Sequence, residues 1–303
     1  MRGKVINIYN KQLETFISVA DAGSFNKAAE NMFITPTAVI KQINSLENSL
    51  NLKLFIRTNQ GVILTESGKS FYNDVKYIIQ YSRDSVMRAR NAMNKSKNII
   101  RIGTSLMTPG QFLMESCPNI HELVKDIKFE LVPFENTPEN AREILKNLGH
   151  NFDIIAGIFD DKLLEYRECA ALELKIEPIR CAVSIYHPLA SKKSIAVKDL
   201  YGENLMILKR GSFSSLDNLR EDLWRNHPQI NIIDFDFYSL DVFNRCENSN
   251  NILIAVDPWK NAHPLLKILP VEWDYTVPYG LLHSQNPSLL IKKFLDVVKK
   301  ISF

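Results

Sequence analysis

Residues 24–47 have the apolar spacing of two short helices joined by a tight turn. Ser24 is an N-cap residue for the first of these helices, and Thr35-Pro36 places an N-cap beside a proline at the first helical position of the second. Residues 11–21 precede them with apolar residues at i, i+3, i+4 and i+7, the pattern of an amphipathic helix with one buried face. Three helices in this order predict a helix-turn-helix domain.

The helix that begins at Pro36 has an apolar face and a mixed face. The apolar face, expected to pack on the first two helices, consists of Val39, Ile43, Leu46 and Leu50. The mixed face, expected to point outward, consists of Thr37, Ile40, Lys41 and Asn44. In a helix-turn-helix this helix enters the DNA major groove, where hydroxyls, amides, cations and small apolar groups contact base edges. A solvated face with one stray isoleucine is the alternative from this helix alone.

Residues 52–65 consist of two apolar runs around Asn59-Gln60-Gly61, which predicts a short β-hairpin. Such a hairpin beside a helix-turn-helix is a wing. It carries Arg57, which could pair with a phosphate or enter a narrow minor groove. The alternative is an ordinary solvated arginine.

Thr65 is the expected cap of a long helix that reaches about Asn94. Its apolar and small residues step alternately by four and three, the spacing of a heptad seam. We expect this helix to pair with its copy in a second subunit, and packing against its own chain is the alternative. The candidate dimerisation residues are Phe71, Val75, Ile78, Ser82, Ser85 and Ala89.

Charge is divided unevenly along the 303 residues. Residues 1–95 hold 13 Lys and Arg against 7 Asp and Glu, whereas the remainder holds 24 against 27. A basic first third beside a slightly acidic body indicates that the first part meets a polyanion. The length predicts two or three compact units at roughly 100–200 residues each.

Four short motifs follow one another between residues 20 and 68. They are Ala20 and Gly23-Ser24-Phe25 with Ala28-Ala29; Thr35, Ala38-Val39, Gln42-Ile43 and Leu46-Glu47; Leu54-Phe55 with Arg57; and Leu64-Thr65 with Gly68. In these motifs the chain resembles the LysR-type transcriptional regulators. It departs from their usual pattern at Ile40, where serine is usual, and at Lys41, where arginine is usual; the isoleucine could contact a thymine methyl group. The candidate DNA-binding residues are then Ser24, Thr35, Pro36, Thr37, Ile40, Lys41, Asn44 and Arg57.

The resemblance implies an α+β multidomain protein. It places a winged helix-turn-helix at 1–66, a linker helix for dimerisation at 67–95, and a two-lobed α/β effector domain similar to a periplasmic binding protein at 98–303. Lobe I would span about 98–176 and 277–303, and lobe II about 177–276. The implied partners are operator or promoter DNA, a small-molecule effector such as a small carboxylate, and RNA polymerase. The chain is also expected to form a homodimer, and two dimers are expected to form a homotetramer.

The carboxy-terminal residues independently predict two α/β lobes. Strand patterns at 99–103, 129–134 and 152–158 alternate with helical ones, and the pattern restarts near Glu177, which indicates parallel sheets with a cleft between them. Ligands bind beyond the carboxyl ends of such strands, near helix amino termini. Each residue selected by this rule could instead be a cap, a turn or a packing residue. The candidates are Thr104, Ser105, Asn136, Thr137, Phe159, Arg210 and Ser212.

Several classes of protein are disfavoured. The amino terminus lacks the apolar region of a signal peptide, and no run approaches the ~18 apolar residues of a membrane span, so we expect a cytoplasmic protein with no membrane partner. The four cysteines and six histidines lack metal-ligand spacing, so we expect no metal and no cofactor. No nucleophile, phosphate or dinucleotide motif points to an enzyme. A cytoplasmic small-molecule-binding protein, or an enzyme on a binding-protein-like fold, is the alternative to a regulator.

Overall fold

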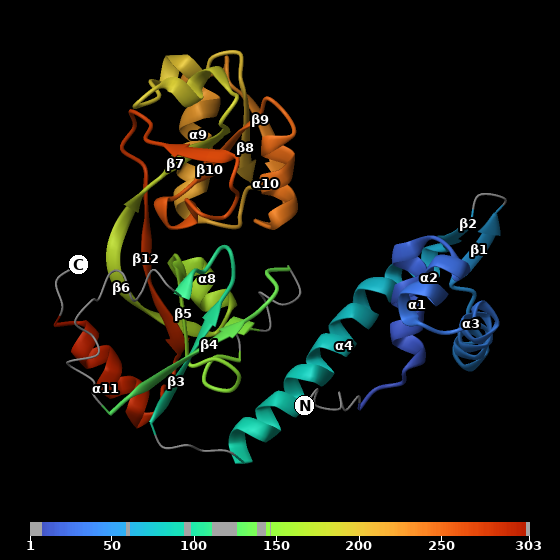
Figure 1. Cartoon of the computed structure of the whole chain (residues 1–303). Coiled ribbons are helices and arrows are strands. Elements are labelled where there is room, and N and C mark those ends of the chain that lie inside the picture. The colour runs from blue at the N-terminus through green and yellow to red at the C-terminus, as the bar shows by residue number, and fades with distance from the viewer. Residues whose placement is uncertain are drawn as a thin grey trace. The chain divides into compact units, whose positions relative to one another are not determined.

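The computed structural model describes residues 8–58, 61–93, 98–110, 126–137, 144–145 and 147–300. The chain divides into two compact units, Met1–Asn94 and Lys95–Phe303 (Figure 1). Each unit has a hydrophobic core of its own.

The first unit begins with three helices, and the second and third of them start at the capping residues of the sequence. The hydroxyl oxygen of Ser24 accepts a hydrogen bond from Lys27 N at 3.5 Å, and that of Thr35 accepts one from Ala38 N at 3.2 Å. Pro36 occupies the first turn of its helix. The predicted starts of the second and third helices are therefore confirmed. The helices are α1 (Gln12–Ala22), α2 (Phe25–Met32) and α3 (Pro36–Leu50).

The predicted hairpin and long helix follow. Strand β1 (Phe55–Thr58) pairs antiparallel with β2 (Gly61–Leu64). Helix α4 (Glu66–Met93) begins directly after Thr65, whose hydroxyl oxygen accepts a hydrogen bond from Gly68 N at 2.9 Å. The cap, the wing and the long helix are thus confirmed.

Two glycines let the hairpin approach its neighbours closely. Gly61 has φ +138°, and a Cβ there would lie 2.5 Å from the carbonyl oxygen of Gly23, which also accepts a hydrogen bond from Val62 N at 2.9 Å. A Cβ on Gly68 would lie 2.2 Å from the carbonyl oxygen of Leu54. Larger residues would push the wing away from the α1–α2 turn and α4 away from the start of β1.

The core of the first unit surrounds Phe16, which is fully buried. Val39 and Ile43 of α3 pack in this core as their spacing predicts. Leu50 does not: it is 37% exposed, and the expectation that it packs on the first two helices is wrong. It ends α3, and Asn51 then takes the left-handed conformation that turns the chain away.

Lobe I of the second unit is built on a mixed sheet. Among the described residues its strand order is β4-β3-β5-β12-β6, with β3 parallel to β4 and β5, and β12 antiparallel to β5 and β6. Helix α11 (Leu289–Val298) packs on this sheet through Phe294, in one cluster with Ile100 and Ile102. The other elements are β3 (Ile99–Thr104), β4 (Lys128–Pro133), β5 (Ile154–Ile158), α8 (Asp161–Tyr166), β6 (Cys169–Pro178) and β12 (Thr276–Ser284).

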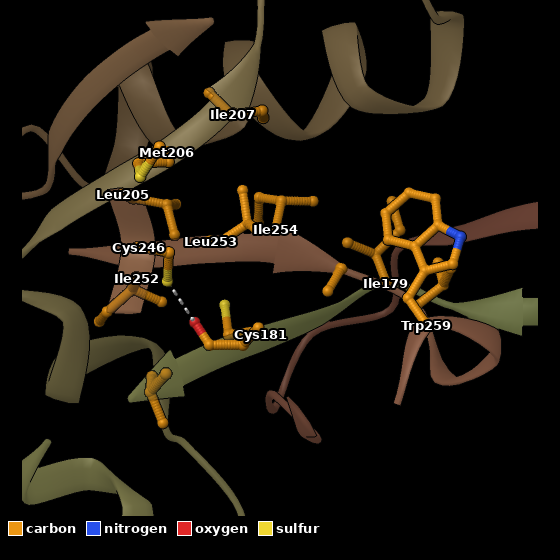
Figure 2. Close-up of a cluster of buried hydrophobic side chains, with 14 of the residues drawn as sticks. Ile179, Cys181, Leu205, Met206, Ile207, Cys246, Ile252, Leu253, Ile254 and Trp259 are labelled. Atoms are coloured by element: carbon orange, nitrogen blue, oxygen red, sulfur yellow. Dashed lines mark hydrogen bonds between the residues drawn. The ribbon is translucent and has the colours of Figure 1, made fainter. Parts of the chain in front are cut away.

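Lobe II has a second mixed sheet, with the order β11-β7-β10-β8-β9 in the described chain. Figure 2 shows aliphatic side chains of β8 and β10 in its core, together with Trp259. The strands are β7 (Arg180–Ser184), β8 (Asn204–Leu208), β9 (Asn231–Phe235), β10 (Ile252–Ala255) and β11 (Leu266–Leu269). The helices are α9 (Ser214–Asn226) and α10 (Leu240–Glu247), with short 3₁₀ turns at Pro188–Ser191, Val197–Leu200 and Asp257–Trp259.

The two lobes are joined by the long antiparallel strands β6 and β12 (Figure 1). Their register shifts between Tyr279 and Gly280, and a Cβ on Gly280 would lie 2.1 Å from the carbonyl oxygen of Leu172. The expectation of parallel sheets is therefore correct only in part. Strand β3 is parallel to β4 and β5, and β8 is parallel to β9 and β10, but β12 is antiparallel in lobe I and β7 and β11 are antiparallel in lobe II. Alternating strand and helix patterns do not encode the direction of a strand that returns from another lobe.

Candidate nucleic-acid interface and ligand pockets

The outer face of α3 presents the residues that the sequence placed there. Thr37, Lys41 and Asn44 are exposed, and Ile40 is half-buried between them. Among the described residues, no carboxylate forms an ion pair with Lys41. The face therefore offers a hydroxyl, an amide, a cation and part of an aliphatic surface side by side.

The two capping hydroxyls can each still donate a hydrogen bond. The oxygens of Ser24 and Thr35 each accept a backbone hydrogen bond, which leaves each hydroxyl proton available. Pro36 is exposed beside them. A phosphate oxygen near the start of α2 or α3 could accept these protons.

Arg57 lies on the wing with its guanidinium over an aromatic ring. Its Cζ is 5.1 Å from the centre of the Phe25 ring, and it forms no ion pair with a carboxylate in the described chain. On the opposite strand, Val62 is its partner. The cation is thus exposed and held against the beginning of α2.

Two polar residues of the matched motif support this surface from inside. The hydroxyl of buried Thr15 donates to Gln42 Oε1 at 2.6 Å and joins α1 to α3. Glu47 is 5% exposed and accepts hydrogen bonds from Leu54 N at 2.8 Å and Phe55 N at 3.2 Å. Periodicity alone gives Glu47 no role, because its partners lie in the next element.

The charge of Glu47 is stabilised by the same contacts. Burial alone would raise the pKa of its carboxyl, but the hydrogen bond from Lys53 and those from the two backbone N–H groups outweigh burial and lower the pKa. Lys53 Nζ lies 2.7 Å from Glu47 Oε2. Glu47 therefore anchors the start of the wing to α3 as a carboxylate.

The seam predicted on α4 is divided between two environments. Val75 is fully buried in the core of its own unit and presents no surface to a second copy, whereas Phe71 is half-buried against the same core. The heptad spacing fits packing within the unit equally well, so the position of Val75 is corrected and that of Phe71 stays a prediction. Ser82 is 8% exposed, whereas Ile78 is 42% exposed. Ser85 is half-buried and Ala89 is exposed.

Next to Ile78, two tyrosines extend the exposed surface of α4. The rings of Tyr77 and Tyr81 stack with their centres 5.9 Å apart at an interplanar angle of 25°. Tyr81 is 46% exposed. The sequence reasoning missed both tyrosines because neither belongs to the main heptad series.

In the second unit, Thr104 and Ser105 line a cavity of about 250 Å³ between the lobes. Across from them, Lys260 and Asn261 of lobe II complete its polar wall. The sequence reasoning missed both, since they follow a 3₁₀ turn rather than a strand. The remaining lining residues are Leu106, Pro109, Gly110, Leu131, Pro258 and Ala262.

The polar groups of this cavity are rich in donors. Thr104 Oγ1 accepts from Gly110 N at 3.0 Å, so its proton is available. The hydroxyls of Ser105 and Thr108 are 2.8 Å apart, so one donates to the other and one proton remains. Lys260 adds an ammonium, and the described lining contains no carboxylate. A ligand with acceptor oxygens and a negative charge fits this set.

The lobes meet beside the cavity through buried hydrogen bonds. The indole N–H of Trp259 donates to the carbonyl oxygen of Met107 at 2.9 Å. Asn136 Nδ2 donates to the carbonyl oxygen of Tyr238 at 2.7 Å. Asn136 thus joins the lobes instead of lining the cavity, and neighbouring Thr137 is half-buried outside it.

Phe159, Arg210 and Ser212 do not line the cavity around Thr104. Phe159 is 8% exposed and packs in a cluster with Phe152 and Leu282, so its selection as a ligand residue is corrected to packing. Arg210 is exposed and pairs with Glu221 at 2.8 Å. The structure therefore does not bring the predicted ligand residues together in one pocket.

Ser212 lines a different cavity of about 350 Å³ beside Lys162 and Arg167. The rule that selected Ser212 also points to the nearby amino terminus of α9, but a carboxylate of the chain itself occupies this position. Asp160 Oδ2 accepts from Ser214 N at 2.6 Å, while Asp160 Oδ1 caps α8 by accepting from Leu163 N at 2.8 Å.

The described cysteines are buried thiols. Burial raises the pKa of Cys169 to about 11 and that of Cys246 to about 12, and it raises that of Cys181 further. Figure 2 shows the Cys246 thiol, which donates to the carbonyl oxygen of Ala182 at 3.6 Å. Cys117 lies outside the described residues. A buried thiol with a raised pKa holds little of the reactive thiolate at neutral pH, which is the opposite of what a redox-sensing cysteine needs.

Within the described residues, no cluster of three or more His, Cys, Asp or Glu side chains has the arrangement of a metal site. In the same part of the chain, no helix combines the length and hydropathy needed to cross a membrane.

Comparison with known proteins finds a family model that matches the first unit, and relatives of the chain. Residues 10–69 match the family model described as the bacterial regulatory helix-turn-helix protein, lysR family. An uncharacterized HTH-type transcriptional regulator of Methanocaldococcus jannaschii, MJ0300, is 28% identical over 309 residues, which is 95% of this chain and 97% of that protein. The Hca operon transcriptional activator HcaR of Escherichia coli is 27% identical over 200 residues, 65% of this chain and 64% of HcaR.

Solved structures share the fold of the whole chain. The crystal structure of CbnR, a LysR family transcriptional regulator, matches with a TM-score of 0.53 at 16% identity, covering 97% of this chain and 99% of that one. Full-length CbnR in complex with its target DNA matches with a TM-score of 0.51 at 16% identity, covering 96% and 98%. These matches have the expected order of a helix-turn-helix unit followed by a two-sheet α/β unit.

Proposed function

We propose that this chain is a DNA-binding transcription regulator of the LysR family and that it responds to a small carboxylate bound between the lobes of its second unit. The observation that carries the proposal is the donor-rich cavity around Thr104 and Ser105, with Lys260 as its cation. Apolar walls from Leu106 and Pro258 would cover the rest of such a ligand. A cavity of this kind, mainly apolar with a few placed polar groups, is typical of small-molecule sites.

For the first unit, we propose that α3 enters the major groove. Lys41 and Asn44 would contact base edges, and Thr37 would contact a base or a phosphate. Ile40 would meet a thymine methyl group, an apolar contact where relatives offer a hydroxyl. The hydroxyls of Ser24 and Thr35 beside Pro36 would position the helix on the phosphates.

The wing cation Arg57 is proposed to pair with a phosphate or enter the minor groove. Its exposure and its lack of a described carboxylate partner support this role, because a pre-paired cation would have to give up a partner first. A contact with a phosphate would be independent of the base sequence of the DNA.

Two exposed side chains of α4, those of Ile78 and Tyr81, support pairing of two copies of the chain. Ile78 and Tyr81 form an apolar surface there, continuing toward Ser85 and Ala89. We propose that this surface, rather than Val75, meets the partner helix, and that two such dimers assemble on DNA. RNA polymerase remains a proposed partner of the assembled regulator, which would act in the cytoplasm without catalytic activity.

The DNA contacts are tested by alanine substitution in the full chain. Lys41→Ala and Arg57→Ala should each weaken binding to the duplex upstream of the protein's own gene, and each should reduce the slope of log K against log salt by about 0.9. Lys193→Ala removes the same charge from an exposed site in the second unit and serves as the control. A folded variant that binds with unchanged affinity and slope would remove that residue from the interface.

Ile40→Ser tests base preference separately. We expect binding to shift at one A·T pair of the site, measured by single-base substitutions across the duplex. An unchanged preference at every position would refute the thymine contact.

The ligand pocket is tested with acetate, pyruvate and benzoate as probes. At least one should change the DNA affinity or the melting temperature of the wild-type chain. The combined variant Thr104→Ala, Ser105→Ala should keep its ligand-free DNA affinity and lose that response, because two hydroxyl donors are gone. Lys260→Gln should weaken the response as well. A full response in the combined variant would exclude this pocket.

A further inference from the structure

The wing is held against one short segment, the turn from Gly23 to Phe25. Val62 N donates to Gly23 O at 2.9 Å, and the missing side chain of Gly61 allows that close approach. Arg57 lies opposite Val62 in the hairpin, with its guanidinium carbon 5.1 Å from the centre of the Phe25 ring. The backbone of the wing and its cation are therefore fixed by the same turn.

The Phe25 ring has two different surroundings. It packs edge-on to Phe55, with ring centres 6.2 Å apart and an interplanar angle of 71°. Phe55 in turn packs against Phe16 in the centre of the core, at 5.3 Å. Phe25 itself is only half-buried and contributes a ring face to the Arg57 guanidinium. A leucine could replace the packing of this ring, but it could not provide the negative π face that attracts a cation.

An arginine on a two-stranded hairpin needs such a support. Its long side chain has many rotamers, and each must be given up when the guanidinium binds a phosphate. A ring that already holds the cation lowers that entropic cost, since fewer rotamers remain to be lost. No carboxylate of the described chain competes for the same guanidinium.

We infer that Phe25 is a positioning residue for DNA binding: its ring holds the Arg57 guanidinium over the start of α2, ready for a phosphate. This inference rests on the proposed DNA contact of Arg57. Phe25 itself does not touch DNA in this account, and its whole contribution passes through Arg57.

A double-mutant cycle on the full chain separates this role from packing. Binding to the upstream duplex is measured by fluorescence anisotropy over a range of salt concentrations for wild type, Phe25→Leu, Arg57→Ala and the double variant. Phe25→Leu should weaken binding roughly two- to five-fold, the range of an exposed cation–π contact, and reduce the salt slope. In the Arg57→Ala background the same substitution should have no further effect.

Three further variants serve as controls. Phe25→Tyr keeps an aromatic face and should bind like wild type. Phe25→Met keeps apolar bulk without a ring and replaces Phe25→Leu if that variant does not fold. Phe55→Leu removes the ring that packs on Phe25 and leaves the Phe25 ring face under Arg57 in place, so it should lower stability without changing the salt slope.

The outcomes are distinguishable. If the leucine or methionine variant binds like wild type, or loses as much affinity with Arg57 absent as with it present, Phe25 does not act through Arg57. If Arg57→Ala itself binds with wild-type affinity and slope, the proposed contact of Arg57 fails and the inference fails with it. If wild type binds no such duplex at low salt, the failure lies in the proposed DNA site as a whole.

Discussion

Removing the Glu47 carboxylate should break the hydrogen bonds that hold the start of the wing against α3. In Glu47→Ala the N–H groups of Leu54 and Phe55 lose their acceptor while they remain buried. Each unsatisfied buried donor costs about 1–3 kcal/mol, so the two donors together should lower the free energy of unfolding of the first unit by ~2–6 kcal/mol. That is a large part of the roughly 5–15 kcal/mol that stabilises a typical domain.

Lys53→Ala is the matched control, because it breaks the same ion pair from the exposed side. The Lys53 side chain is 75% exposed, so solvent screens its contact at 2.7 Å and the expected loss is under ~1 kcal/mol. Hydrogen exchange of peptides from residues 47–58, measured by mass spectrometry in the intact chain, reports the opening free energy locally. Equal losses in the two variants would refute the argument that backbone N–H groups are the important partners.

The lowered pKa of Glu47 also fixes the direction of a pH effect. The folded state holds this carboxyl below its ordinary pKa of 4.5, so its charge adds stability that is fully present above that value. The added stability is lost as pH falls through the folded pKa. Glu47→Gln keeps one acceptor oxygen and should be less stable than wild type at neutral pH, with the difference shrinking in acid. A difference that grows as pH falls would contradict the assignment.

Backbone geometry and thiol burial give three further tests. Phe33 is 94% exposed and has the left-handed φ of +55°. Phe33→Gly should relieve this backbone strain, raise the free energy of unfolding by up to about 1 kcal/mol and so raise the melting temperature. A lower melting temperature would contradict this. Gly68→Ala should destabilise the first unit by at least ~1–3 kcal/mol in the exchange assay, since the Leu54 carbonyl would lie 2.2 Å from the new methyl, and wild-type stability would contradict this. In a Cys117→Ser chain, the remaining thiols should react with a disulfide reagent at pH 8 only after unfolding, and rapid reaction of the folded chain would show that the thiols are accessible.

The first unit was predictable from sequence because its signals are local. Ser24 and Thr35-Pro36 mark helix starts through contacts within one turn, and the Asn59–Gly61 cluster marks the wing. The outer face of α3 follows from the same spacing. What the spacing could not show is that Phe25 lies under Arg57, since that contact joins two elements 32 positions apart in the chain.

The α4 seam shows the limit of periodicity. A heptad pattern indicates that one face is apolar, but it does not say which surface covers that face. Val75 is covered by the helices of its own unit, whereas Ile78 is left exposed. Both positions fit the same repeat.

The residues that line the ligand pocket could be recognised only with the fold in hand. Thr104 followed from the rule that ligands bind beyond strand ends, and it does line a cavity. The opposite wall comes from Lys260, far along the chain on a turn that the rule does not consider. The same rule also selected the start of α9, where Asp160 of the chain itself supplies the anion.

The central claim, that the first unit binds duplex DNA through α3 and the wing, is tested most directly by titrating the wild-type chain against the duplex upstream of its own gene. We expect retarded migration at low salt and a log K that falls linearly with log salt, with a slope of about −0.9 for each phosphate contacted. A purified, folded chain that binds no such duplex at low salt would contradict the account.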